Sequence, residues 1–158
     1  MKRLLLLSLF ASLTFLYVGC DSSDDETVTP PVAQDKIVNT WISEGAGVAP
    51  GLVALLKTVK ITATFNSNNT YTVIAKDSAG AEVTYSGTYS VSENTGTTIR
   101  SITLNQSVPT SVTSQGIYEV DAKGLMTYEV IQTTPAINGF TPPVPSEGFG
   151  STKYLGTP

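Results

Sequence analysis

Reactive side chains are scarce in this chain of 158 residues. It contains no histidine and one cysteine, Cys20. The commonest general base and metal ligand is therefore missing, and an internal disulfide cannot form. Cys20 is the one strongly reactive group whose position needs a chemical explanation.

Carboxylates and hydroxyls offer the other candidate chemistry. Glu119 and Glu129 fall on strands that we expect to pair, but on the polar outer face where solvated carboxylates normally lie. Ser86, Ser101 and Ser114 have no basic neighbour of the kind that activates a hydroxyl nucleophile. Metal ligands do not cluster at a workable spacing. We predict that the protein is not an enzyme and holds no metal or cofactor.

The residues before Cys20 have the layout of an export signal. Lys2 and Arg3 precede an uncharged apolar run, residues 4–18, which is too short to cross ~30 Å of hydrocarbon comfortably. Lys2 and Arg3 are two of the 9 basic residues, so cleavage after residue 19 leaves 7 against 13 acidic residues, a net charge of −6. Such a chain lacks the basic surface that nucleic acid requires.

The stretch Tyr17-Val18-Gly19-Cys20 resembles the lipobox of bacterial lipoproteins. The resemblance implies a signal peptide over residues 1–19, a diacylglycerol thioether on Cys20, and acylation of its amine after cleavage. Several acyl chains make a stable anchor, since each buried methylene contributes ~0.8 kcal/mol. We expect a cell-envelope protein anchored to the outer membrane, on its periplasmic or exposed face. An ordinary secretory signal with an incidental cysteine is the alternative.

Residues 20–35 are expected to form a flexible tether, because their acidic side chains, Ser, Thr and prolines cannot build a core. The acidic patch that contains Asp24, Asp25 and Glu26 also resembles the export signal of surface lipoproteins in Bacteroidetes-type bacteria. The two interpretations are compatible.

Residues 36–158 have the pattern of an all-β domain. Runs rich in Val, Ile, Thr and Tyr recur throughout, separated by clusters of Asn, Asp, Gly and Ser. Besides three hairpins, strands are expected at residues 37–43, 99–105, 111–120 and 149–155, with one short helical segment at 51–57. Eight antiparallel strands joined mostly in sequence predict an up-and-down barrel, because closure removes the sheet edges.

The three hairpins are predicted to share one construction, a type I turn followed by a left-handed residue. The left-handed residues are Asn69, Gly80 and Gly124. The cross-strand pairs are then Phe65 with Tyr71, Ala63 with Val73, Val73 with Tyr85, Ala75 with Val83, Lys76 with Glu82, Tyr118 with Tyr128, and Val120 with Met126. A one-residue slip would invert the apolar face. That inner face is predicted to contain Val59, Ile61, Phe65, Tyr71, Val73, Val83, Tyr85, Tyr89, Val91, Tyr118, Val120, Met126, Tyr128 and Val130.

The order of these parts resembles the lipocalin-like domains of bacterial lipoproteins. The matching stretches are Asn39-Thr40-Trp41, in the place of Gly-x-Trp in the first strand, the hairpin 65–71, Gly87-Thr88-Tyr89, and the stretches 116–119 and 148–150. The resemblance implies an eight-stranded barrel, a size at which the interior is either filled or holds one small ligand.

The predicted interior is rich in tyrosine: Tyr71, Tyr85, Tyr89, Tyr118 and Tyr128. Either these rings interdigitate as core with their hydroxyls at the rim, or they wall a cavity in which phenols contact a ligand.

Three further features belong to the ligand hypothesis. Arg100 points either into the barrel mouth or, with a bulge at Ile99, to solvent. The proline-rich stretch 133–147, with Phe140, and the apolar stretch 52–56 are each expected to be a lid, a plug or a partner site. We predict that the domain binds or carries a small hydrophobic or amphipathic molecule. The alternative is a non-catalytic domain that binds a protein or glycan through its outer face.

Overall fold

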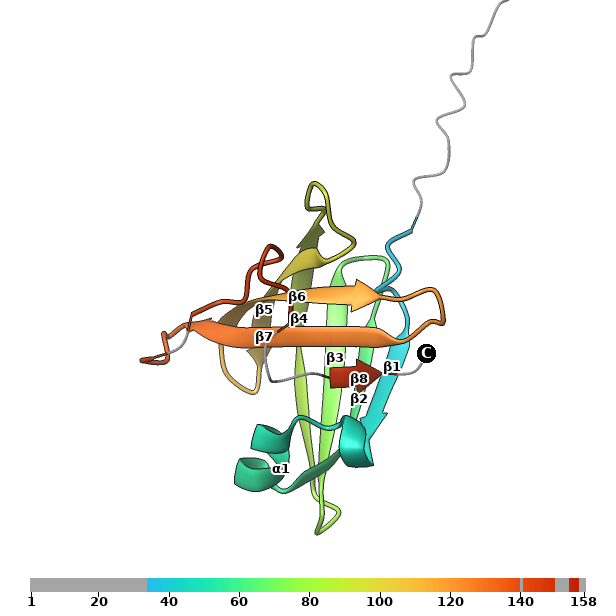
Figure 1. Ribbon diagram of the computed structural model, residues 1–158. Coiled ribbons are helices and arrows are strands. Elements are labelled where there is room, and N and C mark those ends of the chain that lie inside the picture. The colour runs from blue at the N-terminus through green and yellow to red at the C-terminus, as the bar shows by residue number, and fades with distance from the viewer. Residues whose placement is uncertain (1–33, 140, 150–153, 157–158) are drawn as a thin grey trace, which may run out of the picture. The chain divides into compact units, whose positions relative to one another are not determined.

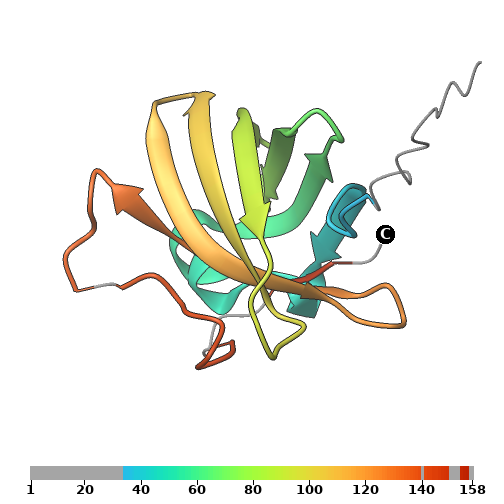
Figure 2. The ribbon, with the colours of Figure 1, turned by 90° about the horizontal axis from the view of Figure 1, so that it is seen from above.

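Seven antiparallel strands, joined in sequence order, form a sheet that curls into a half-barrel (Figures 1 and 2). A computed structural model describes residues 34–139, 141–149 and 154–156. The strands are β1 (Thr40–Glu44), β2 (Thr58–Phe65), β3 (Thr70–Asp77), β4 (Glu82–Ser92), β5 (Arg100–Val108), β6 (Val112–Val120) and β7 (Met126–Thr134). The predicted all-β meander is confirmed. The predicted signal peptide, most of the tether, Cys20 and Phe140 lie outside the described residues.

The end of the chain differs from the expected strand at 149–155. A three-residue segment, β8 (Tyr154–Gly156), pairs with the first residues of β7. Phe149 is half-buried and lies in a loop, and residues 150–153 lie outside the described part. The predicted strand therefore begins too early, because Phe149 supplies a strand-like side chain without pairing in a sheet.

Two short helical segments connect β1 to β2: η1 (Gly45–Gly47) and α1 (Pro50–Leu56). This confirms the expected helical segment at 51–57. Pro50 suits the first turn, where its missing N–H costs nothing. Lys57 ends the helix in the left-handed conformation, with φ of 55°, and its N–H donates to the carbonyls of Leu52 and Val53.

All three hairpins have the predicted geometry and register. Asn69, Gly80 and Gly124 are left-handed, with φ of 62°, 89° and 79°, and every predicted cross-strand pair is present. In two of the loops an aspartate stabilises the turn. Oδ1 of Asp77 accepts N–H bonds from Ala79 and Ala81, and Asp121 does the same for Lys123 and Leu125.

The predicted inner face needs two corrections. Val59 and Val83 are 41% and 46% exposed. A register shift between Thr58 and Lys60 turns Val59 outward and leaves Thr58 buried in its place. Val83 faces Ala75 as expected, but it is the second residue of β4, next to the β3–β4 turn, and stays exposed there.

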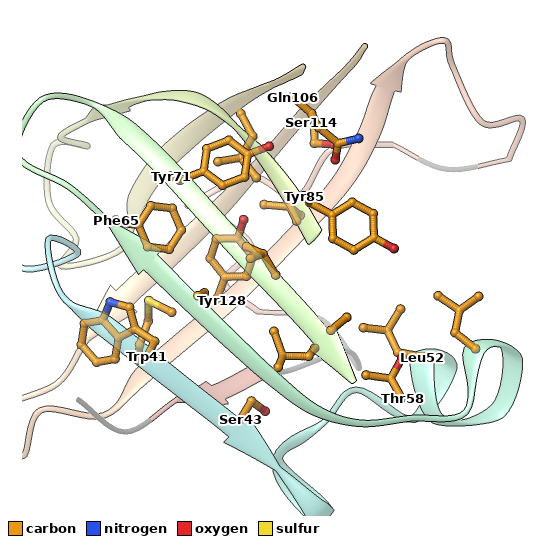
Figure 3. A pocket seen from close by; sticks show the side chains of 18 residues that line it. Trp41, Ser43, Leu52, Thr58, Phe65, Tyr71, Tyr85, Gln106, Ser114 and Tyr128 are labelled. Carbon is orange, nitrogen blue, oxygen red and sulfur yellow. The ribbon is translucent and has the colours of Figure 1, made fainter. Parts of the chain in front are cut away.

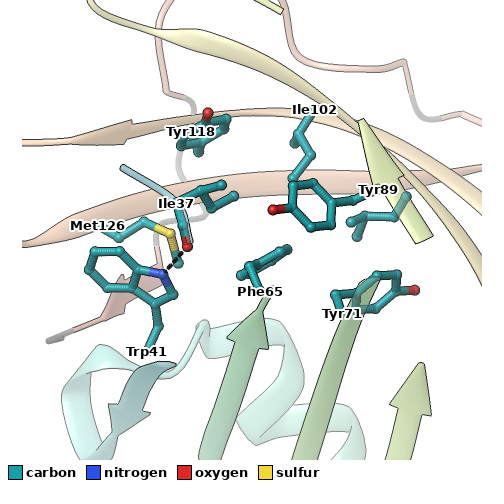
Figure 4. Close-up of a cluster of buried hydrophobic side chains, with 9 residues drawn as sticks. Ile37, Trp41, Phe65, Tyr71, Tyr89, Ile102, Tyr118 and Met126 are labelled. Atoms are coloured by element: carbon teal, nitrogen blue, oxygen red, sulfur yellow. Dashed lines mark hydrogen bonds between the residues drawn. The ribbon is translucent and has the colours of Figure 1, made fainter. Parts of the chain in front are cut away.

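Aromatic rings dominate the core (Figure 4). The ring of Phe65 packs edge-on against Tyr89, with centroids 5.1 Å apart, and nearly parallel to Tyr71 at 6.1 Å. The Trp41 indole N–H donates to the carbonyl of Ile37 at 2.8 Å, so its polar atom is satisfied where the ring is buried. The core therefore ties the segment before β1 to the inner face of the sheet.

Two glycines allow a matched test of the packing between strands. A Cβ built on Gly87 meets the backbone of Asn105 and Gln106 on β5, whereas one built on Gly51 in α1 has nothing within 4 Å. We expect Gly87→Ala to lower the free energy of unfolding by about 1–3 kcal/mol. Gly51→Ala should leave it unchanged or raise it by up to about 1 kcal/mol. Urea denaturation measures both, and equal midpoints for the two variants would contradict this account of the close β4–β5 approach.

Candidate functional site

A pocket with a volume of about 270 Å³ lies between α1 and the inner face of the sheet (Figure 3). Side chains from α1 and from each of the strands β1–β7 contribute to its wall. Its aromatic lining residues are Trp41, Phe65, Tyr71, Tyr85 and Tyr128. The pocket therefore occupies the part of the half-barrel that the core does not fill.

The lining is apolar and uncharged. Besides the aromatic side chains it contains Leu, Ile, Val, Ala and Met residues, and none of the described residues that line it is Asp, Glu, Lys or Arg. The additional polar lining residues are Ser43, Thr58, Gln106 and Ser114. A site of this kind suits a ligand whose surface is uncharged and apolar, and it offers that ligand few hydrogen-bonding groups.

Small side chains at two inward positions create the space. In one row across the strands, Trp41 pairs with Ala63, which pairs with Val73. In the next row, Ser43 pairs with Ile61, which pairs with Ala75. Because alanine fills far less volume than its neighbours in the same rows, the curled sheet leaves a hollow there.

Ser43 is a lining residue that the sequence reasoning missed. It is buried, and its hydroxyl has no hydrogen-bond partner within the described part of the chain. An unpaired buried hydroxyl costs about 1–3 kcal/mol. The sequence could have indicated this position, because Ser43 is two residues after Trp41. Side chains alternate along β1, so Trp41 and Ser43 point inward and Ile42 and Glu44 point outward.

The five predicted tyrosines lie in the pocket wall, in the packed core or in both. Tyr71, Tyr85 and Tyr128 line the pocket. Tyr71 also belongs to the packed core, together with Tyr89 and Tyr118, and the Tyr89 hydroxyl donates to the Asn66 carbonyl at 2.8 Å. Packing of tyrosine rings and lining of a pocket thus occur in the same interior, while contact of the phenols with a ligand stays a prediction. Burial raises the pKa of the Tyr71 and Tyr89 hydroxyls, so both stay protonated near neutral pH.

Arg100 does not line the pocket. Its guanidinium forms ion pairs with Asp35 at 2.9 Å and with Glu93 at 3.2 Å, and its side chain is 30% exposed. The Tyr118 hydroxyl donates to Asp35 Oδ1 at 2.7 Å, and the Ile37 N–H donates to the same oxygen. Asp35 therefore joins the start of the domain to β5 and β6, although the sequence placed it in the tether.

The apolar helix α1 borders the pocket. Leu52 and Leu56, four residues apart and so on one helical face, line the wall. On the same helix, Leu55 is 83% exposed and Val53 is 41% exposed. The residues of the stretch 133–147 that the structure describes do not line the pocket, and Phe140 is outside the described part.

The candidate catalytic groups do not converge on the pocket. Glu119 accepts a hydrogen bond from the Thr98 hydroxyl and pairs in register with Thr127, away from the pocket lining. Ser114 lines the pocket, while the Ser101 hydroxyl lies within hydrogen-bonding distance of Asn94. Across the described residues, Asp, Glu, Cys and His do not gather in groups able to hold a metal ion.

No protein-family model, no curated protein and no solved structure matches this chain. In the described ranges, the helices are too short or too polar to cross a membrane. The lipoprotein and lipocalin-like resemblances therefore stay predictions from the sequence.

The Tyr118 contact predicts a loss of stability in alkali. Burial first, and then the hydrogen bond to Asp35, raises the pKa of the Tyr118 hydroxyl well above its usual value. The contribution of this hydroxyl to the free energy of unfolding is complete below about pH 10. It is lost as the pH rises further, because the Tyr118 hydroxyl then ionises in the unfolded chain but not in the folded one. Tyr118→Phe should therefore reduce the alkaline fall in unfolding free energy by up to about 1.4 kcal/mol per pH unit. Urea denaturation from neutral to alkaline pH measures this, and identical slopes for variant and wild type would refute it.

Proposed function

We propose that this domain binds one small hydrophobic or amphipathic molecule in the pocket beneath α1. The observation that carries the proposal is a cavity of about 270 Å³ with an uncharged wall of aromatic and aliphatic side chains. Ligand pockets usually enclose ~300–1,000 Å³, so this one suits a small ligand. An apolar cavity of ~150 Å³ is already enough to take up benzene.

The proposal includes closure into a lipocalin-like barrel of eight strands. Two observations support closure. β8 pairs with β7 at Met126–Tyr128, and β8 also lies close to β1 at the other end of the strand order. Closure would shield the apolar interior on the side where the half-barrel is open, and it would protect the edge strands from pairing with other chains.

We further propose that the protein is a lipoprotein anchored to the cell envelope through Cys20 and has no enzymatic activity. Its support is the lipobox-like stretch that ends at Cys20, preceded by a short apolar run and followed by acidic residues. The domain would then work at a membrane surface, on the outer membrane, where apolar molecules need a carrier through water.

One observation favours the second candidate, a non-catalytic interaction domain. The helix α1 exposes Val53 and Leu55, and Leu56, which also lines the pocket, is 56% exposed. An exposed apolar surface of this kind is typical of a contact site. A partner protein that covers α1 would bury these side chains without entering the pocket.

Filling the pocket tests ligand binding directly. Ala75→Phe places a large ring in the wall, whereas Ala79→Phe adds the same ring at the exposed β3–β4 turn. We expect Ala75→Phe to weaken binding of an environment-sensitive hydrophobic dye by about tenfold or more, and Ala79→Phe to leave it unchanged. Fluorescence titration measures the affinities. A wild-type protein that binds no dye would contradict the proposal.

Substitution of Cys20 tests the anchor separately. We expect Cys20→Ser to abolish incorporation of a labelled fatty acid and to move the protein from the membrane fraction to the soluble fraction of expressing cells. Ser22→Ala, two residues further on, should retain both label and membrane association. Equal labelling of the wild type and Cys20→Ser would exclude lipidation at Cys20.

A further inference from the structure

Ser43 is unusual among the side chains that line the pocket. It is 6% exposed, its Oγ is screened from solvent, and that oxygen has no hydrogen-bond partner in the described part of the chain. Its neighbours across the strands are Ile61 and then Ala75, which provide no polar side-chain atom. Natural proteins seldom leave a buried hydroxyl without a hydrogen-bond partner, so an unpaired one needs a physical explanation.

The position of Ser43 links it to the pocket rather than to the core. It lies on β1 two residues after Trp41, and both side chains line the pocket wall. Figure 3 shows Ser43 on one side of the pocket and the other polar pair, Gln106 and Ser114, on the opposite side. Gln106 already donates its Nε2 hydrogen to the Thr110 carbonyl at 2.9 Å. Among the described lining residues, Ser43 is the one whose side-chain oxygen is both screened from solvent and without a hydrogen-bond partner.

The charge of the wall restricts the ligand further. A carboxylate or ammonium group would lose its water in this pocket without meeting an opposite charge, since none of the described lining residues is ionised near neutral pH. Arg100, which the sequence offered as a ligand contact, is paired with Asp35 and Glu93 and does not line the pocket. The pocket therefore disfavours ions of either sign.

Resting on the proposed ligand-binding function, we infer that the ligand is an electrically neutral molecule with an apolar body and one hydroxyl or carbonyl group that pairs with the Ser43 hydroxyl. A serine hydroxyl both donates and accepts, so it matches either group. The apolar body then fills the space left by Ala63 and Ala75 and contacts the aromatic wall. The unpaired Ser43 hydroxyl lowers the stability of the ligand-free protein. The hydrogen bond to the ligand compensates for this loss.

Four probes with one ring system separate these requirements. Naphthalene, naphthol, naphthoate and naphthylmethylammonium differ mainly in their polar group, and fluorescence titration of the full chain gives each affinity near neutral pH. We expect naphthol to bind most tightly, naphthalene next, and the two ions most weakly. Tightest binding of either ion would overturn the inference of a neutral ligand.

Ser43→Ala tests the anchor. We expect this variant to bind naphthol about three- to tenfold more weakly, the effect of one neutral hydrogen bond, and to bind naphthalene within about twofold of wild type. Its thermal unfolding midpoint without ligand should be no lower than that of wild type, because an unpaired buried hydroxyl is removed. Ser90→Ala, at an exposed position on β4, is the matched control and should change neither affinity.

The outcomes separate the two proposals. If all four probes fail to bind the wild type, the ligand-binding function itself is refuted. If naphthalene and naphthol bind the wild type equally, or if Ser43→Ala binds naphthol as wild type does, the pocket still takes up apolar molecules but Ser43 has no part in recognition. The ranking of probes on wild-type protein is independent of how well any variant folds.

Discussion

Cross-strand register is the constraint on which this structure depends. Each hairpin closes through a left-handed residue at a set position, Asn69, Gly80 or Gly124, and the turn decides which residues face each other. Because side chains alternate along a strand, that choice puts the rings of Phe65, Tyr71 and Tyr89 on one face. The contact of Phe65 with Tyr89 exists only because β2, β3 and β4 are aligned in this way.

The same alignment produces the pocket. Large inward side chains meet at one end of the curled sheet and form the core around Phe65. Further along the same strands, inward positions are occupied by the small residues Ala63, Ala75 and Ser43, and side chains no longer fill the interior. A close-packed interior would be more stable, since each cavity forgoes contacts between its lining atoms. The hollow and the unpaired serine are the observations on which the proposed ligand rests.

Polar contacts at the beginning of the domain hold the curl in place. Asp35 accepts from Tyr118 and pairs with Arg100, while Trp41 donates to Ile37 in the same segment. Residues that precede the first strand thereby attach to β5 and β6, which are distant in the sequence. Tyr118 and Arg100 look like ligand contacts when only their strand parity is known, but in the fold they stabilise the end away from the pocket lining.

The sequence by itself determined the β class, the meander order, the short helix after the first strand and the register of three hairpins. All of these depend on local signals: alternation, turn residues and spacing of a few positions. Only the tertiary structure decided which tyrosines pack in the core, which line a pocket and which do both, because that depends on the curl of the whole sheet. The surroundings of Asp35, Arg100 and Ser43 were likewise decided there. Asp35 meets Arg100 and Tyr118, whereas Ser43 has apolar neighbours across the strands. Such contacts join residues far apart in the chain, and no local pattern records them.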